Sequence, residues 1–267
     1  MDWNDPTVWS MIIAGVALVL SQLPPLREII KGTKVKITNP DTFQLYHYLG
    51  SIHLTLFLDI HNIGGRSVVI DKLYSFILDE NDDVFHFPAQ SYMPRSVVPS
   101  ESLPEFPVGR IILKPDERWY ENTHFYKMWT EAAVEEVDEI VLSVRDNIYQ
   151  KQKSKEENDG NWISTDSDIH QRVIQFFYKN FPLFKGNYRF ILVALAEDDS
   201  VLAIKGYEFT LFESHIRTLK SYIDDYQYGA GIYFPLRDTM KYLWIRLRLI
   251  DNERRVRQIY DRLLKKL

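Results

Sequence analysis

The chain has 267 residues, of which 45% are hydrophobic and 26% are charged, and its formal net charge at pH 7 is -5. This composition is that of an ordinary globular protein and excludes a largely disordered chain. The absence of cysteine excludes a disulfide framework, cysteine-based metal sites and cysteine nucleophiles.

The first feature along the chain is an uncharged run of 21 residues, 6–26. As a helix this run would be about 31 Å long, enough to span a hydrocarbon core of about 30 Å. The pair Pro24-Pro25 would end such a helix shortly before them. The run predicts a transmembrane helix within an anchor segment 1–30. Its apolar side chains are Trp9, Met11, Ile12, Ile13, Val16, Leu18, Val19 and Leu20.

Two other interpretations of the run are open. A cleaved signal peptide normally begins with basic residues and ends at small residues, and neither feature is present here. A buried core helix fits the modest length of the run and the polar residues within it. The spanning helix explains the flanking charges better than either alternative.

Basic residues gather on only one side of the run, at Arg27, Lys31, Lys34 and Lys36. Because positively charged flanks stay in the cytoplasm, this asymmetry predicts an N-terminus outside and a cytoplasmic C-terminal domain. The sequence therefore predicts a single-pass signal-anchor protein of a bacterial inner (cytoplasmic) membrane. The membrane itself would be one of its partners.

The clearest predicted strand is 52–62, in which apolar and polar side chains alternate. The glycines Gly64 and Gly65 predict a turn after it. Residues 34–38 are expected to form an edge strand, whose lysines discourage further pairing. An antiparallel meander is expected to continue at 67–70, 73–78 and 84–87.

The middle of the chain is less regular. Prolines across 94–109 predict a long extended loop, before strands at 110–113 and 118–126. Residues 130–151 fit two patterns: we expect a short helix followed by a strand at 139–145, and one continuous helix is the alternative. The polar stretch that starts at residue 151 predicts a mobile insertion over about 151–165.

After this insertion, Ser167 or Asp168 is expected to cap a helix, and 187–196 and 201–212 are expected to form a hairpin. Short strands that are not separated by regular helices predict a mainly β fold. We expect an immunoglobulin-like antiparallel β-sandwich over 31–213, with helical insertions. A helix is expected at 213–228, ended by Gly229.

The C-terminal segment, 214–267, is expected to be helical, and its residues 237–267 include ten Lys or Arg and four Asp or Glu. Its spacing is typical of a basic amphipathic helix, although 243–249 also fits a strand. Three uses are open: packing on the acidic body of the protein, contact with anionic lipid, and nucleic acid binding, which fits least well. The basic residues are Arg246, Arg254, Arg255, Arg257, Arg262, Lys265 and Lys266.

Motifs for catalysis or nucleotide binding are absent from the sequence, which lacks a P-loop, a dinucleotide-binding glycine motif, an H-E-x-x-H helix and a G-x-S-x-G elbow. We therefore predict no cofactor and name no catalytic residue. The best remaining set is His53, Asp59 and His61, which share one face of a predicted strand and could offer a carboxylate and imidazoles to a metal. His86 and His124 are expected on other strands.

Together these features predict a membrane-tethered, non-enzymatic binding or scaffold module. It would present its β-sandwich to a protein partner or ligand, alone or as a subunit of a larger membrane assembly. Two alternatives are open: a sensor or effector of a bacterial stress or defence system, and a metal-dependent hydrolase that uses the histidine-bearing strand face.

Overall fold

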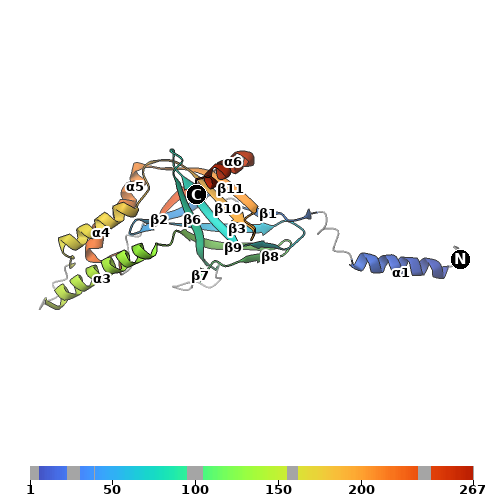
Figure 1. Cartoon of the computed structure of the whole chain (residues 1–267), viewed down its shortest axis with the longest axis horizontal. Helices are drawn as coiled ribbons and strands as arrows, with labels where there is room; N and C mark the ends of the chain where they lie inside the picture. The colour runs from blue at the N-terminus through green and yellow to red at the C-terminus, as the bar shows by residue number, and fades with distance from the viewer. Residues whose placement is uncertain are drawn as a thin grey trace.

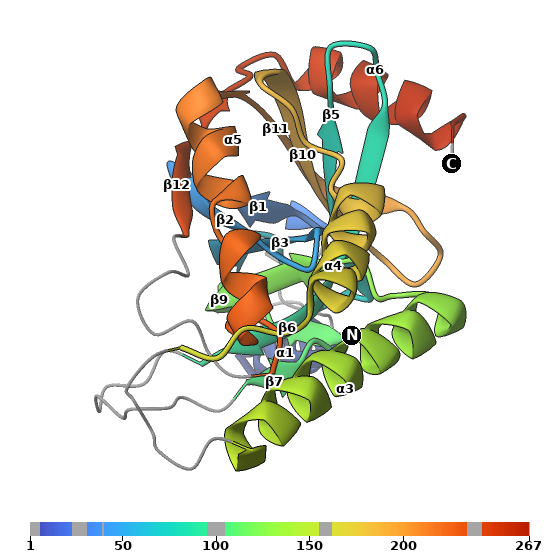
Figure 2. The same ribbon diagram turned by 90° about the vertical axis from the view of Figure 1, so that its left-hand side faces the viewer.

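The computed structural model describes residues 6–22, 31–38, 40–94, 105–154, 162–233 and 242–266 (Figure 1). The fold is mainly β, and its helices lie at the N-terminus, at one end of the sheet and on the outside of the sheet (Figures 1 and 2). The helices are α1 (Pro6–Gln22), α3 (Glu131–Ser154), α4 (Ser167–Asn180), α5 (Glu213–Lys220), the 3-10 helix η1 (Asp224–Tyr228) and α6 (Glu253–Leu264).

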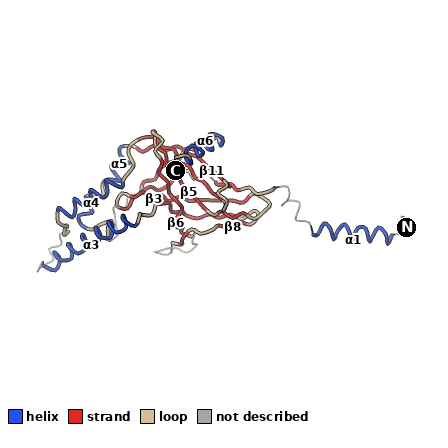
Figure 3. Tube along the Cα trace, viewed as in Figure 1, coloured by secondary structure: helices blue, strands red, loops and turns tan. Residues whose placement is uncertain are grey.

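The strands form one large antiparallel sheet and one small pair (Figure 3). The pair joins β4 (Val68–Ile70) to β8 (Ile111–Leu113). In chain order, the large sheet contains β1 (Val35–Ile37), β2 (Thr42–Tyr48), β3 (Ser51–Asn62), β5 (Lys72–Leu78), β6 (Val84–Met93), β7 (Phe106–Pro107), β9 (Arg118–Tyr126), β10 (Gly186–Leu195), β11 (Val201–Leu211), β12 (Leu243–Arg246) and β13 (Arg248–Leu249).

The large sheet curls into a nearly closed barrel. Its strand order is β12-β2-β3-β9-β6-β5-β10-β11-β13, so the first and last strands of the sheet are neighbours in sequence. β12 pairs with β2 at one edge, and β13 pairs with β11 at the other. At the crossing, the Leu247 N–H donates to Asp41 O at 2.8 Å, and the Ile250 N–H donates to Gly206 O at 2.9 Å. One short segment therefore joins both edges of the sheet.

Aromatic side chains fill the interior of the barrel. Phe43 from β2 stacks on Phe190 from β10, with ring centroids 5.6 Å apart, and meets the edge of Phe209 from β11 at 5.2 Å. All three rings are almost completely buried. Because these strands come from both halves of the sheet, the contacts hold the two halves around a common core.

Helix α6 covers part of the outside of the barrel. Its apolar face, which includes Val256, Ile259 and Leu263, packs against β5, β10 and β11. A Cβ on Gly206 would lie 2.6 Å from the Val256 side chain, so this glycine allows the close approach of the helix. The side chain of Asn252 accepts a hydrogen bond from the Arg255 N–H and caps the helix.

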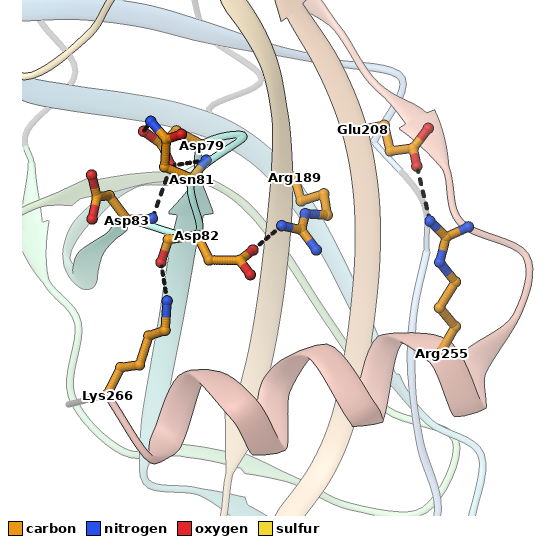
Figure 4. A network of polar contacts seen from close by, with 8 residues as sticks. All are labelled: Asp79, Asn81, Asp82, Asp83, Arg189, Glu208, Arg255 and Lys266. Atoms are coloured by element: carbon orange, nitrogen blue, oxygen red, sulfur yellow. Dashed lines mark hydrogen bonds and ion pairs between the residues drawn. The ribbon is translucent and has the colours of Figure 1, made fainter.

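Basic residues of α6 and of the chain just after it form polar contacts with the acidic body of the protein (Figure 4). Arg255 lies 3.8 Å from the Glu208 carboxylate, and Lys266 Nζ donates to Asp82 O at 2.7 Å. The Asp82 carboxylate also pairs with Arg189 of β10. The C-terminal helix thus packs on the protein itself, the first of its three predicted uses, and its apolar stripe is occupied. The remaining predicted basic residues, Arg246, Arg254, Arg257, Arg262 and Lys265, are exposed.

The helices α3, α4 and α5 lie at one end of the barrel (Figure 2). The turn between β2 and β3 meets the end of α4 there, with Leu49 and Gly50 at φ values of 48° and 93°. A Cβ on Gly50 would lie only 2.5 Å from Phe177 O. Both the positive φ and the close approach therefore require glycine at this position.

The side chain of His47 ties β2 to the helical end. It is 4% exposed, and its Nε2–H donates to Leu219 O at 2.7 Å. Its Nδ1 accepts a bond from the Gly50 N–H at 3.4 Å, which fixes the neutral tautomer. Burial lowers the pKa of His47 to about 4, against a weaker opposing effect of the bond to Leu219.

Several sequence predictions are confirmed. The strand 52–62, the edge strand 34–38, the hairpin over 187–212 and the helix starting at residue 167 match β3, β1, β10 with β11, and α4. Gly229 ends η1 with φ 78°. The residue before α4 is Asp166, which makes no side-chain cap, so neither Ser167 nor Asp168 has the predicted capping position.

Other predictions are wrong. The immunoglobulin-like β-sandwich is replaced by one nearly closed sheet, because β12 and β13 link its edges. The predicted strand 139–145 lies inside α3, a continuous helix. The segment 214–267 is not wholly helical, since 243–249 forms strands. In the loop 94–109, β7 forms at residue 106, and residues 95–104 lie outside the described residues, as do 155–161 of the predicted insertion.

The predicted membrane anchor is also wrong. Among the described residues, no helix is both long and apolar enough to cross a membrane. Helix α1 has 17 residues and is about 26 Å long, short of a hydrocarbon core of about 30 Å. This finding overturns the single-pass topology and the inner-membrane localisation. The anchor side chains Trp9, Met11, Ile12, Ile13, Val16 and Leu18 are exposed. The side chains of Val19 and Leu20 are not described, and Arg27 lies outside the described residues.

We predict that Gly50→Ala destabilises the protein by more than about 2 kcal/mol, because alanine tolerates neither the positive φ nor the contact with Phe177 O. Urea unfolding measures the effect. Gly109→Ala is the matched control, since a Cβ there meets nothing within 4 Å. Equal stability of the two variants would contradict this account of the turn.

We further predict that stability falls as the pH is lowered from about 6.5 to 4. His47 of the folded protein stays neutral until about pH 4, whereas an unfolded imidazole binds a proton near its ordinary pKa of 6.5. The unfolded state therefore binds more protons in this window, and the loss from His47 approaches about 3 kcal/mol. Urea unfolding across this pH range should show a smaller slope for His47→Asn than for the parent chain. An unchanged slope would contradict this assignment and show that another titrating group causes the pH dependence of the unfolding free energy.

Candidate functional site

The candidate site lies on the outer surface of β2, β3 and β9. Along β3, alternate side chains point away from the core onto this surface. Ile52, Leu54, Leu56, Leu58 and Ile60 are buried inside the barrel, as predicted. His53, Thr55, Phe57, Asp59 and His61 lie on the outside. The strand register then decides which outer side chains of the neighbouring strands lie beside them.

Four rings form a continuous row across this surface, which we call the aromatic row: Tyr242, Tyr46, His53 and Tyr126. His53 is opposite Tyr46 of β2 and Tyr126 of β9 in the strand ladder. Successive ring centroids are 5.1 Å apart from Tyr242 to Tyr46, 5.1 Å from Tyr46 to His53, and 4.6 Å from His53 to Tyr126. The last pair is stacked, with an interplanar angle of 15°. The row thus joins the β2–β3 hairpin to β9 and to the residue before β12, which are distant in sequence.

His53 and Tyr46, the two central rings of the aromatic row, are uncharged near neutral pH. Burial lowers the pKa of His53 to about 4, and the neighbouring His124 lowers it further. Burial also raises the pKa of Tyr46 to about 12, although a hydrogen bond with the Thr55 side chain opposes this shift. The row therefore offers flat, neutral rings with few charges, a surface suited to apolar or aromatic groups.

Beside the aromatic row, Ser91, His124 and Glu105 have the composition of a catalytic triad but not its geometry. His124 Nδ1 lies 2.9 Å from Glu105 Oε1, and the Ser91 hydroxyl donates to the same oxygen. A triad needs the serine hydroxyl on the imidazole, with the carboxylate behind it. Here His124 Nε2 is buried and makes no hydrogen bond. The arrangement ties β6 and β9 to the residue before β7 and does not activate a nucleophile.

Other large aromatic side chains on the outer surface of these strands are exposed to solvent. Trp244 of β12 is 66% exposed, Phe57 of β3 is 46% exposed, and Tyr120 of β9 is 45% exposed. We call the aromatic row together with these three residues the open face. On the other half of the barrel, the equivalent outer positions are buried beneath α6. The barrel therefore has one covered side and one aromatic side.

The residues predicted as metal ligands lie on this outer surface but in different surroundings. His53 belongs to the aromatic row. Asp59 Oδ2 accepts a bond from the Thr38 hydroxyl at 3.0 Å and lies 3.9 Å from Arg118. His61 is opposite Lys36 on one side and Arg118 on the other, and these cations disfavour a metal ion. Among the described residues, no group of three or more His, Asp or Glu is placed to hold a metal.

The site residues predicted from the sequence include none of the open-face residues except His53; those not predicted are Tyr46, Phe57, Tyr120, Tyr126, Tyr242 and Trp244. The alternation in β9 indicated that Tyr126 and His124 share a face, but the register that brings them to His53 follows only from the folded sheet. His86 lies elsewhere, beside a cleft near α4.

Comparison of the chain with protein family models, with curated proteins and with solved structures finds no match. The geometry described above therefore carries the functional argument.

We predict that Glu105→Gln lowers the pKa of His124. Burial already lowers this pKa, and the Glu105 carboxylate opposes that shift by favouring the protonated ring. The amide of glutamine lacks the charge, so less of the opposing effect remains. NMR titration of the histidine ring protons measures the change, and His86 in the same spectra is the internal control. A higher pKa of His124 in the variant would contradict the proposed interaction.

Proposed function

We propose that this protein is a non-enzymatic binding module that docks a protein partner on its open face. The observation that supports this proposal best is the exposure of Trp244, Phe57 and Tyr120 on the same outer surface as the aromatic row. Large aromatic side chains dominate the binding energy at protein interfaces, and contiguous exposed apolar patches mark interaction sites.

The charges around the open face also fit a protein interface. Charged residues border its aromatic rings. Asp59 is opposite Tyr120 and lies 3.9 Å from Arg118, and Glu105 contacts His124, two residues before Tyr126. Protein interfaces commonly combine an aromatic centre that is poor in charges with a polar rim. Charges at the rim would orient the partner and affect the association rate more than the final affinity.

A binding role fits the chemistry of the surface better than hydrolysis. The shared contact of Ser91 and His124 with Glu105 gives no pair of nucleophile and base. His53 is held between two tyrosine rings and is neutral at pH 7. Such rings supply rigid contact area at a low entropic cost, which is the property a binding surface needs.

A photocrosslinking experiment tests the location of the interface. We place a benzoylphenylalanine residue at position 57 or 244 in the full chain and irradiate cells that produce the protein. A discrete crosslinked species is expected at both positions. The control is position 184, where Phe184 is as exposed as Trp244 and lies between α4 and β10, outside the strands that form the open face. Crosslinking to the same species from position 184, or none from 57 and 244, would overturn the proposal.

We predict that Trp244→Ala and Phe57→Ala each weaken binding of that crosslinked partner by roughly 10- to 100-fold, because contact residues of this kind are common hot spots. Calorimetry with the purified partner measures the loss. Both side chains are well exposed, so each variant should keep its unfolding free energy within about 0.5 kcal/mol. Phe184→Ala is the control, and an equal loss of affinity in this variant would contradict the assignment.

A further inference from the structure

A cleft of about 410 Å³ opens at the helical end of the barrel, and none of the open-face residues lines it. It lies between the start of β6, the chain that leads from β9 into α3, and the end of α4. Its volume is in the range of pockets that hold small organic ligands.

The cleft exists because the sheet parts at this point. Along Val84–Pro88, β6 pairs with β5, whereas its pairing with β9 begins only at Ala89. Pro88 has no N–H to donate to a ladder, which suits a place where pairing ends. The register then shifts between Ala89 and Ser91, and β9 separates from β6 and leads toward α3. One edge of β6 therefore faces the cleft without a strand partner among the described residues.

The charged residues that line the cleft are both cationic, Lys127 and Lys179, although the chain as a whole is acidic. Lys179 Nζ lies 2.9 Å from Glu136, which partly neutralises it. In the described part of the chain no carboxylate forms an ion pair with Lys127. Burial and the nearby Lys127 lower the pKa of His86, so that its ring is neutral at pH 7 and can form hydrogen bonds.

The first turn of α3 adds to this positive environment. Thr130 and Ala133 line the cleft, and the Ala133 N–H points back to the Thr130 hydroxyl at 3.4 Å. Helix α3 has 24 residues, so its N-terminal dipole favours negative charge nearby. Glu131 in the same turn does not line the cleft but partly offsets this effect, so Lys127 supplies most of the positive charge there.

The remaining walls are largely apolar. Ile52, Phe87, Met128, Trp129 and Pro182 line them. A free inorganic ion would use the lysines but would leave this apolar surface in contact with water. A ligand that fits both features carries an anionic group on a compact apolar or aromatic body.

We propose that this cleft binds a small organic anion, with Lys127 and the start of α3 on its phosphate or carboxylate and with Trp129 and its apolar neighbours on its body. The site is separate from the open face, so its test is independent of the partner-binding proposal.

Calorimetry on the full chain tests this proposal with four probes. 1-Naphthyl phosphate and 1-naphthoate carry the two candidate anionic groups, 1-naphthol carries none, and inorganic phosphate lacks the apolar body. We expect at least one naphthyl anion to bind at least 10-fold more tightly than both 1-naphthol and inorganic phosphate. The stronger of the two anions identifies the preferred group. Equal binding of 1-naphthol and the anions, or no binding of either anion, would overturn the proposal.

Two pairs of variants locate the binding site. Lys127→Gln should weaken the bound naphthyl anion about 10-fold, and Lys114→Gln, an exposed lysine outside the cleft, should not. Ala133→Glu places a carboxylate in the cleft and should abolish binding, while Ala132→Glu in the same turn should leave it unchanged. Glutamate is tolerated at the start of a helix, so both glutamate variants should fold. Equal affinities within either pair would show that the anion binds elsewhere.

Discussion

The structure depends on the junction of the two sheet edges by residues 243–249. Without this segment, β2 and β11 would each present a free edge, and the core would be open along the line between them. Because β12 pairs with one edge and β13 with the other, the chain closes the sheet with a single strand-like segment. Free edges are sites of unwanted pairing, and closure removes them. The closure also fixes the positions of Phe43, Phe190 and Phe209 around one core.

The sheet is closed at β12 and β13, but two other neighbouring strands, β6 and β9, separate along part of their length. The pairing between β6 and β9 starts at Ala89, after a stretch in which β6 has β5 as its partner. The side chain of Gln90, at the register shift, donates to Tyr126 O at 3.4 Å and replaces part of the missing ladder. The same irregularity separates two surfaces of the barrel. Residues of β9 up to Tyr126 belong to the open face, and Lys127 and the residues after it line the cleft.

The sequence contained enough information to identify most individual strands but not their assembly. Alternation in β3 gave its inner and outer faces correctly, because one face of that strand is buried along its whole length. The same pattern suits a sandwich and a barrel, and only the pairing of β12 and β13 distinguishes them.

In α3, the spacing of Ile140 and Val144 fits both a strand and a helix. The exposure of Leu142 distinguishes the two structures. A strand would bury Leu142 with its neighbours, whereas the helix leaves it 45% exposed. The aromatic row could not be predicted as a whole. The hairpin turn sets the pairing of Tyr46 with His53, but the positions of Tyr126 and Tyr242 depend on how β9 and β12 join the complete sheet.

The closing segment also connects folding with the proposed binding surface. Strand β12 alternates, so that Ile245 is buried in the core while Trp244 lies on the open face. Two adjacent residues therefore have different roles: Ile245 contributes to the closure of the barrel, and Trp244 extends the aromatic surface to its edge. A partner bound on Trp244 and Phe57 would contact β12 and β3, which lie on either side of β2. Such a partner would bind only the closed form of the sheet and would stabilise it by mass action. The geometry of the barrel thus makes closure a condition for forming the open face.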